Sequence, residues 1–300
     1  MGFSVDRKTG TEKEQKAVID KVNFVEQKSE EWLKLRKNLI TASSAHQIIP
    51  KTEKIVELYN NILSNLKDKE KVDIESTSGY FNSEYNYYRN KMGLNPFVGN
   101  SATFFGEKYE DISVKYYKDK TQLDVSDYGI LLHSEYPWLG GSPDGIDENG
   151  EMLEIKTLYT RQMIDDYIPL KYYIQVQICL EVADLEHCNY IETSLEEYTN
   201  FNSFWTKLNE TDFYGAVIEN NSSKKYVYNC DIQGYRDFVD DNSGYLTFFK
   251  ILKTNIKSIK RDREFFNEIF PYLKKGIETL EQLKNGEKNL VDLQGYTEYI

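Results

Sequence analysis

Residues 152–158 have the pattern of a short strand that carries charged groups on one face. Successive side chains of a strand point to opposite faces, so Glu154 and Lys156 share one face while Leu153 and Ile155 take the other. The apolar neighbours indicate a buried strand, where an unpaired charge is costly. The stretch therefore predicts a central strand whose carboxylate and ammonium group have a functional role.

A glycine-rich turn before this strand adds a second carboxylate. Residues 140–145 read Gly-Gly-Ser-Pro-Asp-Gly, and the turn signal at residues 147–150 predicts a hairpin that places Asp144 near Glu154. Two carboxylates can hold a hard cation such as Mg²⁺ or Mn²⁺, which activates water for phosphodiester cleavage. The Lys156 ammonium can hold the scissile phosphate or the attacking water. The alternative is an ordinary turn and an amphipathic edge strand with a solvated Glu/Lys pair.

Composition places the chain among globular proteins. It has 300 residues, 40% of them hydrophobic and 14% aromatic, which is enough for a sizeable core. No apolar run approaches a membrane span, and the polar N-terminus lacks the apolar region of a signal peptide, so we expect an intracellular protein, in the cytoplasm or in a host cell. The three scattered cysteines argue against a disulfide framework and against a zinc or iron–sulfur cluster.

The formal net charge of −12 is unlike that of a protein that coats nucleic acid. Screening acts over about 10 Å, however, so a local basic surface can operate within an acidic whole. The candidate basic surfaces are Arg36 with Lys37, the group Lys115, Lys118 and Lys120, and the run from Lys250 through Lys253, Lys257, Lys260 and Arg261 to Arg263. For each of them, a solvated helix face is the alternative.

The N-terminal part predicts two helices and a site for an anion. One helix should begin at Ser29, carry Arg36 and end near Asn38, and a second should run from Thr41 to Pro50. A helix N-terminus rich in Ser and Thr binds anions through backbone N–H groups and hydroxyls. With Arg36 just before it, this terminus could seat a phosphate. An ordinary helical hairpin with a capped second helix is the alternative.

The remaining elements predict an α/β protein with a mixed central sheet flanked by helices. We expect helices over 104–118 and 170–182, and strands over 129–132, 189–193 and 225–228. Residues 76–88 should form a surface loop, and the chain should be helical from Phe248. No linker or repeat is evident, so we expect a flexible or helical arm at 1–28, a single domain at 29–285 and a tail at 286–300.

Several short motifs follow one another in order along residues 30–280, and together they resemble a known family. Those motifs are Arg36 with Thr41-Ala42-Ser43, Gly106-x-x-x-Glu110, Ser142-Pro143-Asp144-Gly145, Leu153-Glu154-Ile155-Lys156, Tyr172-x-x-Gln175-x-Gln177, and a late Arg261-Asp262 followed by Phe265 and Phe266. In this order they resemble the lambda-exonuclease branch of the PD-(D/E)XK nucleases, the YqaJ-like viral recombinase family.

The resemblance implies a restriction-endonuclease-like core with helical additions at both ends. It also implies a Mg²⁺- or Mn²⁺-dependent exonuclease that digests double-stranded DNA from its ends, 5′→3′, in viral recombination. A homotrimer around DNA and a single-strand annealing protein as partner are further implications. The implied metal ligands are Asp144, Glu154, the Ile155 carbonyl and Glu110; Lys156 would position water, Gln175 would support it, and Arg36, Thr41 and Ser43 would bind the DNA 5′-phosphate.

Two other functions remain open at this point. A restriction- or repair-type endonuclease could use the same core, and it would cut a closed circle that an exonuclease cannot enter. A catalytically inactive DNA-end-binding protein could keep the fold without the chemistry. The complete set of Asp144, Glu154 and Lys156 argues against the inactive protein.

Overall fold

The computed structural model of the chain describes residues 22–23, 25, 29–63, 83–95, 99–220, 226–230 and 244–293. Most of the predicted arm at 1–28 and the last part of the predicted tail therefore lie outside the described residues. The beginning of that tail contains a short 3-10 helix, η2 (Leu290–Leu293), in place of the expected loose segment. Within the described ranges, no helix is both long and apolar enough to cross a bilayer.

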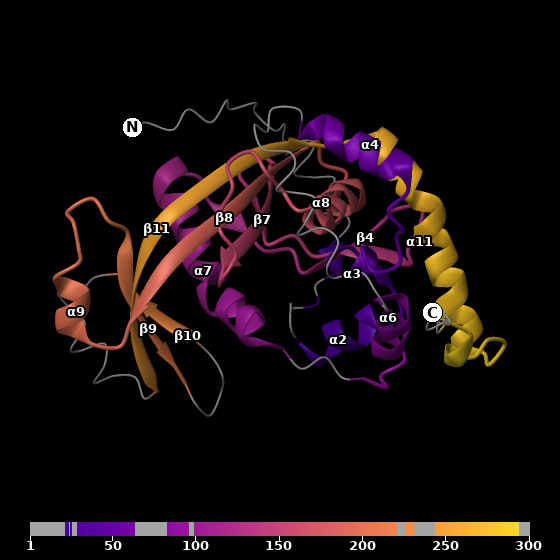
Figure 1. Cartoon of the computed structure of the whole chain (residues 1–300), viewed down its shortest axis with the longest axis horizontal. Coiled ribbons are helices and arrows are strands. Elements are labelled where there is room, and N and C mark those ends of the chain that lie inside the picture. Colours follow the sequence, from indigo (N-terminus) through magenta and orange to yellow (C-terminus); the bar gives the residue numbers. More distant parts are fainter. Residues whose placement is uncertain are drawn as a thin grey trace, which may run out of the picture.

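The core is a seven-stranded mixed sheet, as predicted (Figure 1). Only one of its neighbouring pairs, β7 with β8, is parallel. The long strands β8 and β11 extend beyond the core to β9, β10 and the helix α9 at one end of the molecule. In sheet order the strands are β10 (Tyr226–Asn229), β9 (Tyr214–Glu219), β11 (Tyr245–Lys260), β8 (His187–Tyr198), β7 (Met152–Leu158), β6 (Gly145–Asp147) and β3 (Val125–Ser126).

A smaller four-stranded sheet joins the N-terminal segment to the glycine-rich turn. Its order is β1 (Val22–Asn23), β4 (Ile130–Leu132), β5 (Leu139–Gly141) and β2 (Ile40–Thr41). Strand β2 was not predicted from the sequence; it pairs in parallel with β5 in the register Ile40↔Leu139. This pairing brings the segment that follows Arg36 beside the turn that leads to Asp144.

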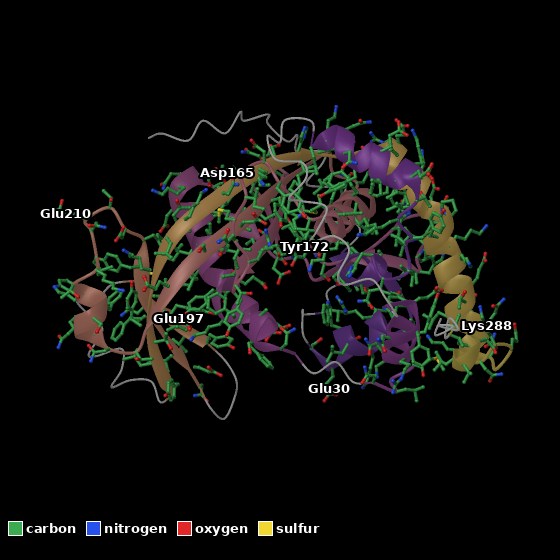
Figure 2. All side chains as sticks on the ribbon, viewed as in Figure 1. Glu30, Asp165, Tyr172, Glu197, Glu210 and Lys288 are labelled. Carbon is green, nitrogen blue, oxygen red and sulfur yellow. The ribbon has the colours of Figure 1, made fainter. Side chains whose placement is uncertain are left out.

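Two helices cover opposite faces of the large sheet near its centre. Helix α7 (Ser101–Thr121), capped by Asn100, packs on the face that carries Leu153 and Ile155. Helix α8 (Leu170–Ala183) follows Pro169 and packs on the other face, with Met152 in the same core cluster. Figure 2 places Tyr172, on α8, near the middle of the molecule, whereas Glu210 and Lys288 lie toward its two ends.

Shorter helices and the C-terminal helix complete the molecule. Helix α11 packs against α4 and α8 and contributes the buried stripe predicted from its sequence, including Phe265, Ile269 and Leu280. The helical additions expected at both ends are therefore present. The helices other than α7 and α8 have the following bounds: α2 (Glu30–Arg36), α3 (Ala42–Ala45), α4 (Glu53–Ile62), α6 (Ser83–Lys91), α9 (Phe201–Trp205) and α11 (Arg263–Lys284).

Three predicted elements were wrong. Residues 245–260 form strand β11 where a helix was expected from Phe248, because this segment pairs with both β8 and β9. Residues 83–88 belong to helix α6 where a loop was expected, because Tyr87 and Tyr88 are buried in the core. The second N-terminal helix shrinks to the four residues of α3, since β2 takes up Ile40–Thr41.

Candidate active site

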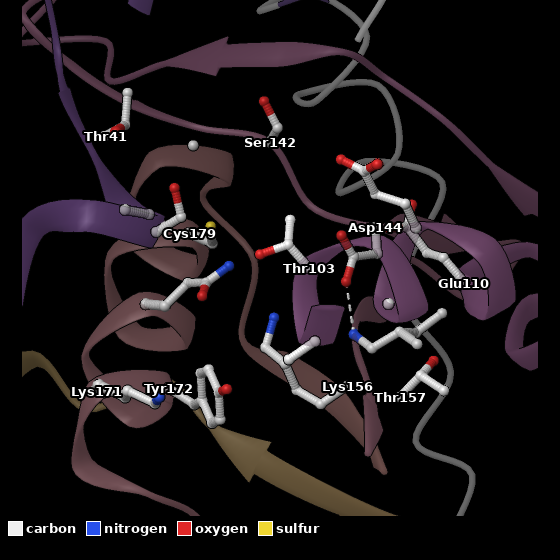
Figure 3. Close-up of a pocket in the computed structure, with 18 of the residues that line it drawn as sticks. Thr41, Thr103, Glu110, Ser142, Asp144, Lys156, Thr157, Lys171, Tyr172 and Cys179 are labelled. Atoms are coloured by element: carbon white, nitrogen blue, oxygen red, sulfur yellow. Dashed lines mark hydrogen bonds between the residues drawn. The ribbon is translucent and has the colours of Figure 1, made fainter. Parts of the chain in front are cut away.

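A pocket of about 590 Å³ opens between α7, α8 and the strands of the two sheets (Figure 3). Residues from the N-terminal segment form part of its wall, and the turn before β6 and the outer half of β7 form the rest. Most of the predicted site residues line it: Arg36, Thr41, Ser43, Glu110, Asp144, Ile155, Lys156 and Gln175. Glu154 does not line it, because its side chain is wholly buried behind the wall.

Strand pairing holds Asp144 beside the central strand. Gly145 is opposite Leu153 in the antiparallel register of β6 and β7, so Asp144 stands opposite Glu154 and on the same face. The Asp144 N–H donates to the Leu153 carbonyl (3.1 Å), and the Ile155 N–H donates to Asp144 Oδ2 (2.6 Å; Figure 3). The hairpin predicted from the sequence therefore brings the two carboxylates together.

Glu154 is a buried carboxylate that depends on two neighbours. The Lys156 ammonium forms a short ion pair with Oε1, and Gln175 Nε2 donates to the same oxygen at 2.6 Å. Oε2 is buried and has no hydrogen-bond partner among the described residues. The pKa of Glu154 is raised to about 8: burial is the largest cause, the Lys156 charge opposes it, and the charges of Asp144 and Glu110 add to the rise. The interactions with Lys156 and Gln175 therefore do not fully offset the cost of burying the Glu154 charge.

Lys156 lies between the buried acid and the pocket. Burial alone would lower its pKa, but the carboxylates of Glu154 and Asp144 outweigh burial and raise the pKa above its ordinary value. Its Nζ lies 5.0 Å from the centre of the Tyr172 ring. Lys156 is therefore a fixed positive charge, with 20% of its side chain exposed at the pocket.

The oxygen donors have the chemistry of a divalent-metal site, although the side chains are not gathered around one point. Carboxylates and backbone carbonyls are the ligands of Mg²⁺ and Mn²⁺, and Asp144, Glu154, Glu110 and Ile155 supply them. The part of the chain that the structure describes contains no cluster of three His, Cys, Asp or Glu side chains that could hold an ion. The buried Glu154 Oε2 fits a cation, because it is a carboxylate oxygen with no partner among these residues.

The other end of the pocket is basic and rich in hydroxyls. Arg36 Nη2 donates to Ser43 Oγ at 3.0 Å, and the guanidinium stacks on the Trp32 ring at 4.0 Å. Burial lowers the pKa of Arg36 to about 10, which still leaves it charged at neutral pH. Thr41 is buried, and its hydroxyl pairs with Ser44 at 2.7 Å. Arg36 and Ser43 therefore lie together at the pocket, with Thr41 behind them.

Two residues that support this end, Trp32 and Lys91, were missed in the sequence. Trp32 Nε1 donates to Ser142 Oγ at 3.2 Å, which ties α2 to the turn before Asp144. The Lys91 ammonium is buried and donates to the carbonyls of Arg36 (2.8 Å) and Leu39 (2.6 Å). A spacing of four residues on one helix could have linked Trp32 to Arg36. Lys91 could not have been found, since its helix was predicted as a loop.

The two glutamines of helix α8 lie about 200° apart around the helix axis and have different contacts. Gln175 reaches Glu154, whereas Gln177 donates to the Lys260 carbonyl (3.0 Å) and accepts from the Asp262 N–H (2.7 Å). Gln177 therefore fixes the joint between β11 and α11.

The late Arg-Asp motif is a structural feature of the same joint. The Arg261 side chain is buried and pairs with Glu181 and Asp184, near the C-terminal end of α8. Asp262 caps α11 by accepting from the Phe265 N–H at 2.9 Å. Neither side chain lines the active-site pocket.

Among the predicted basic groups, Arg36 reaches the pocket, whereas the others are engaged elsewhere. Lys115 and Lys118 pair with acidic neighbours on the surface of α7 and beyond its end. Lys250 and Lys253 lie on β11, where they pair with Asp212 and Asp165. The alternative of a solvated helix face over 250–263 is wrong, because most of this segment is strand β11.

The chain is similar in sequence to a viral protein. The chain is 29% identical over 204 residues to protein R354 of Acanthamoeba polyphaga mimivirus; the match covers 62% of this chain and 32% of that protein. The chain therefore spans about a third of the length of that relative.

Solved structures give the same fold. The alkaline exonuclease LHK-Exo from Laribacter hongkongensis has a TM-score of 0.50 at 16% identity, with 88% of this chain and all of that chain covered. Its complex with dAMP has a TM-score of 0.51 at 15% identity, over the same shares of both chains. The fold is restriction-endonuclease-like. The profile of the YqaJ-like viral recombinase domain matches residues 31–186, about half of the chain, and the chain belongs to this family.

Proposed function

We propose that this protein is a metal-dependent DNA exonuclease that digests double-stranded DNA from its ends in the 5′→3′ direction. One observation carries the proposal: a single pocket contains the Asp144 carboxylate and the Lys156 ammonium at its centre and the Arg36–Ser43 pair at one end. The centre has groups for hydrolysing a phosphodiester, and the end has groups for holding a phosphate. The similarity to LHK-Exo supports the same activity.

Asp144, Glu154 and the Ile155 carbonyl would hold Mg²⁺ or Mn²⁺, with Glu110 as a further ligand. When bound, the metal would activate water and stabilise the charge that develops on the phosphate. Lys156 would position the scissile phosphate or the attacking water through its ammonium. Gln175 would keep Glu154 oriented by its hydrogen bond.

The direction of digestion follows from the position of the phosphate-binding end. Arg36 and Ser43 would hold a 5′-terminal phosphate, with Thr41 shaping the wall behind them. A DNA strand fixed by that phosphate would place its next phosphodiester bond at Asp144 and Lys156. A homotrimer and a single-strand annealing protein as partner belong to the same proposal, and they rest on family membership.

The test is digestion of a linear duplex with or without a 5′-phosphate, in Mg²⁺ or in EDTA. We expect release of nucleotides in Mg²⁺ from the phosphorylated end, slower release without the phosphate, and none in EDTA. Asp144→Ala should abolish release. Digestion that proceeds in EDTA, or that survives Asp144→Ala, would overturn the proposed chemistry.

A restriction- or repair-type endonuclease on the same core is the second candidate. A supercoiled plasmid without nicks separates the two, because an exonuclease requires an end. Linearisation of the plasmid in Mg²⁺ would favour the endonuclease. Binding of linear duplex without any cleavage in Mg²⁺ or Mn²⁺ would favour an inactive end-binding protein.

A further inference from the structure

A second buried acid lies next to the active site, and the proposed chemistry does not use it. Glu192 is on β8, directly opposite Lys156 in the parallel register of β7 and β8. Its side chain is wholly buried and does not line the pocket. It pairs with Arg161, which stands in the segment after β7, lines the pocket and keeps 20% of its side chain exposed. The pair therefore joins the sheet interior to the pocket wall.

The contacts of Glu192 indicate that it holds Arg161 in place. Oε1 accepts from Arg161 Nη2 and from the Tyr190 hydroxyl (2.9 Å). Oε2 is buried without a hydrogen-bond partner among the described residues. Burying a carboxylate is costly, and a pair with an unsatisfied oxygen is a poor way to stabilise a fold. The pair is better explained by the orientation that Glu192 imposes on the Arg161 side chain.

The segment that carries Arg161 is anchored as well. Lys257 Nζ, on β11, donates to the carbonyls of Ile164 (3.2 Å) and Tyr167, and Lys253 pairs with Asp165 at 2.8 Å. These contacts tie residues 164–167 to β11. The segment that directly follows Arg161 is thus anchored, and the Arg161 side chain is held by Glu192.

The Arg161 guanidinium has donors to spare. Arginine presents five N–H groups in a planar fork, a shape that matches two oxygens of a phosphate. Nη2 is engaged by Glu192, and Nη1 makes only a long contact of 3.4 Å with the Gln162 carbonyl. The remaining N–H groups have no hydrogen bond among the residues that the structure describes. They belong to a side chain that lines the pocket.

Arg161 lines the same pocket as Arg36 and stands on the segment that follows β7. It interacts electrostatically with Tyr172, whose ring lies 5.0 Å from Lys156 Nζ. In Figure 3 Lys156 lies beside Tyr172, whereas Thr41 and Ser142 lie toward the top of the view. The pocket therefore has a cationic group near Tyr172 and Lys156, which is Arg161, in addition to Arg36 beside Ser43.

We propose that Arg161, oriented by the buried Glu192, binds the DNA phosphate on the 3′ side of the scissile one. Arg36 and Ser43 would hold the terminal phosphate, so the cleaved strand would be fixed on both sides of the bond that breaks. This inference rests on the proposed exonuclease function. Arg161 is then a binding residue for the substrate backbone, and Glu192 is a positioning residue.

The first test measures binding of 5′-phosphorylated duplex in EDTA, where no cleavage can occur. Arg161→Gln should weaken binding about tenfold. It should also lower the slope of log affinity against log salt by about 0.9, the value for one phosphate contact. Glu192→Gln should weaken binding less and leave the slope nearly unchanged, because the Arg161 charge remains. The matched control is Arg263→Gln, which breaks an exposed pair with Glu186 away from the pocket and should change neither quantity.

The second test places an uncharged methylphosphonate at the phosphate 3′ of the scissile one. Wild-type protein should lose about as much affinity as it loses through Arg161→Gln, and the variant should lose no more. Additive losses, or an unchanged salt slope, would overturn the assignment of Arg161. If Arg161→Gln fails to fold, the double variant Arg161→Gln/Glu192→Gln removes both charges and serves in its place.

The two proposals fail in different ways. Wild-type protein that does not digest linear duplex in Mg²⁺ or Mn²⁺ contradicts the exonuclease proposal. Wild-type protein that digests it, while Arg161→Gln binds with unchanged affinity and salt slope, contradicts only the role of Arg161.

Discussion

The ammonium group of Lys156 is paired with the carboxylate of Glu154, two residues earlier on the same strand, and it separates that carboxylate from the pocket. The pair has two consequences. Lys156 is held at the pocket wall by a fixed acid, and Glu154 depends on Lys156 and Gln175 for its compensation. A substitution at Lys156 therefore affects folding as well as chemistry.

Lys156→Met should lower the free energy of unfolding by about 3 kcal/mol, because breaking a buried pair leaves an uncompensated charge. Glu154→Gln together with Lys156→Met should recover most of that loss, since neither charge remains. Neither variant should cleave DNA. Denaturant unfolding at pH 8 measures the stabilities, and equal stabilities for the single and double variants would contradict the pairing.

The two glutamines of α8 provide a matched pair of substitutions. Gln175→Leu should reduce cleavage about 10- to 100-fold, the usual effect of removing a partner of a metal-site carboxylate. Gln177→Leu should destabilise the fold by about 2 kcal/mol or more, because the Lys260 carbonyl and the Asp262 N–H lose their partner. Cleavage per folded molecule should stay near the wild-type rate in Gln177→Leu, and a selective loss of its activity would contradict this division.

Lys91 predicts a pH dependence of stability. Burial, with the charges of Arg36 and Lys284, lowers the pKa of Lys91 from its ordinary value of 10.5 to about 7. Between these values the unfolded chain keeps a proton that the folded protein has released, so stability rises with pH across that interval. Below about pH 7 both states are protonated, and the cost of the buried cation is fully present.

The measurement compares wild type with Lys91→Met at pH 7.5 and pH 9.5. Relative to the variant, the wild type should gain about 2 kcal/mol in its free energy of unfolding, since each pH unit contributes at most about 1.36 kcal/mol. The variant also loses the hydrogen bonds to the Arg36 and Leu39 carbonyls, which changes its free energy of unfolding equally at both pH values. The proton release from Lys91 makes the difference in free energy between the two proteins depend on pH. Parallel pH profiles for the two proteins would show that Lys91 keeps an ordinary pKa.

Metal binding should stabilise the folded protein. A ligand at 100 times its dissociation constant adds about 2.7 kcal/mol, so Mg²⁺ or Mn²⁺ should raise the midpoint of thermal unfolding, and EDTA should reverse the change. Asp144→Asn should remove most of the shift. Glu107→Gln is the control, because Glu107 lines the same pocket on an exposed position of α7. A shift that persists in Asp144→Asn would place the metal elsewhere.

The central part of the fold could be predicted because its signals are local. The alternation at residues 152–158, the turn at 147–150 and the helical spacing of Tyr109 and Ile112 all correspond to elements observed at those positions. The N-cap at Ser29 is also observed, with its side chain accepting from the Trp32 N–H. In each case, residues a few positions apart fix the element.

Other elements depend on contacts between distant segments. β11 reads as a basic helix by itself, and it is a strand because β8 and β9 supply hydrogen bonds on both of its edges. β2 has two residues and exists because β5 lies beside it. The Tyr-rich helix α6 is stable because its tyrosines are buried against other segments of the core.

The sequence by itself determined which residues are the candidates for the chemistry: two carboxylates and a lysine in and beside one strand, and an arginine close to a serine. These assignments follow from residue type and short-range spacing, which strand and helix geometry convert into shared faces. Only the tertiary structure decided that Glu154 is sealed behind Lys156, that Lys91 is buried under Arg36, and that Arg161 is held by Glu192. Burial and ion pairing arise between segments that are remote in sequence, so local patterns cannot reveal them.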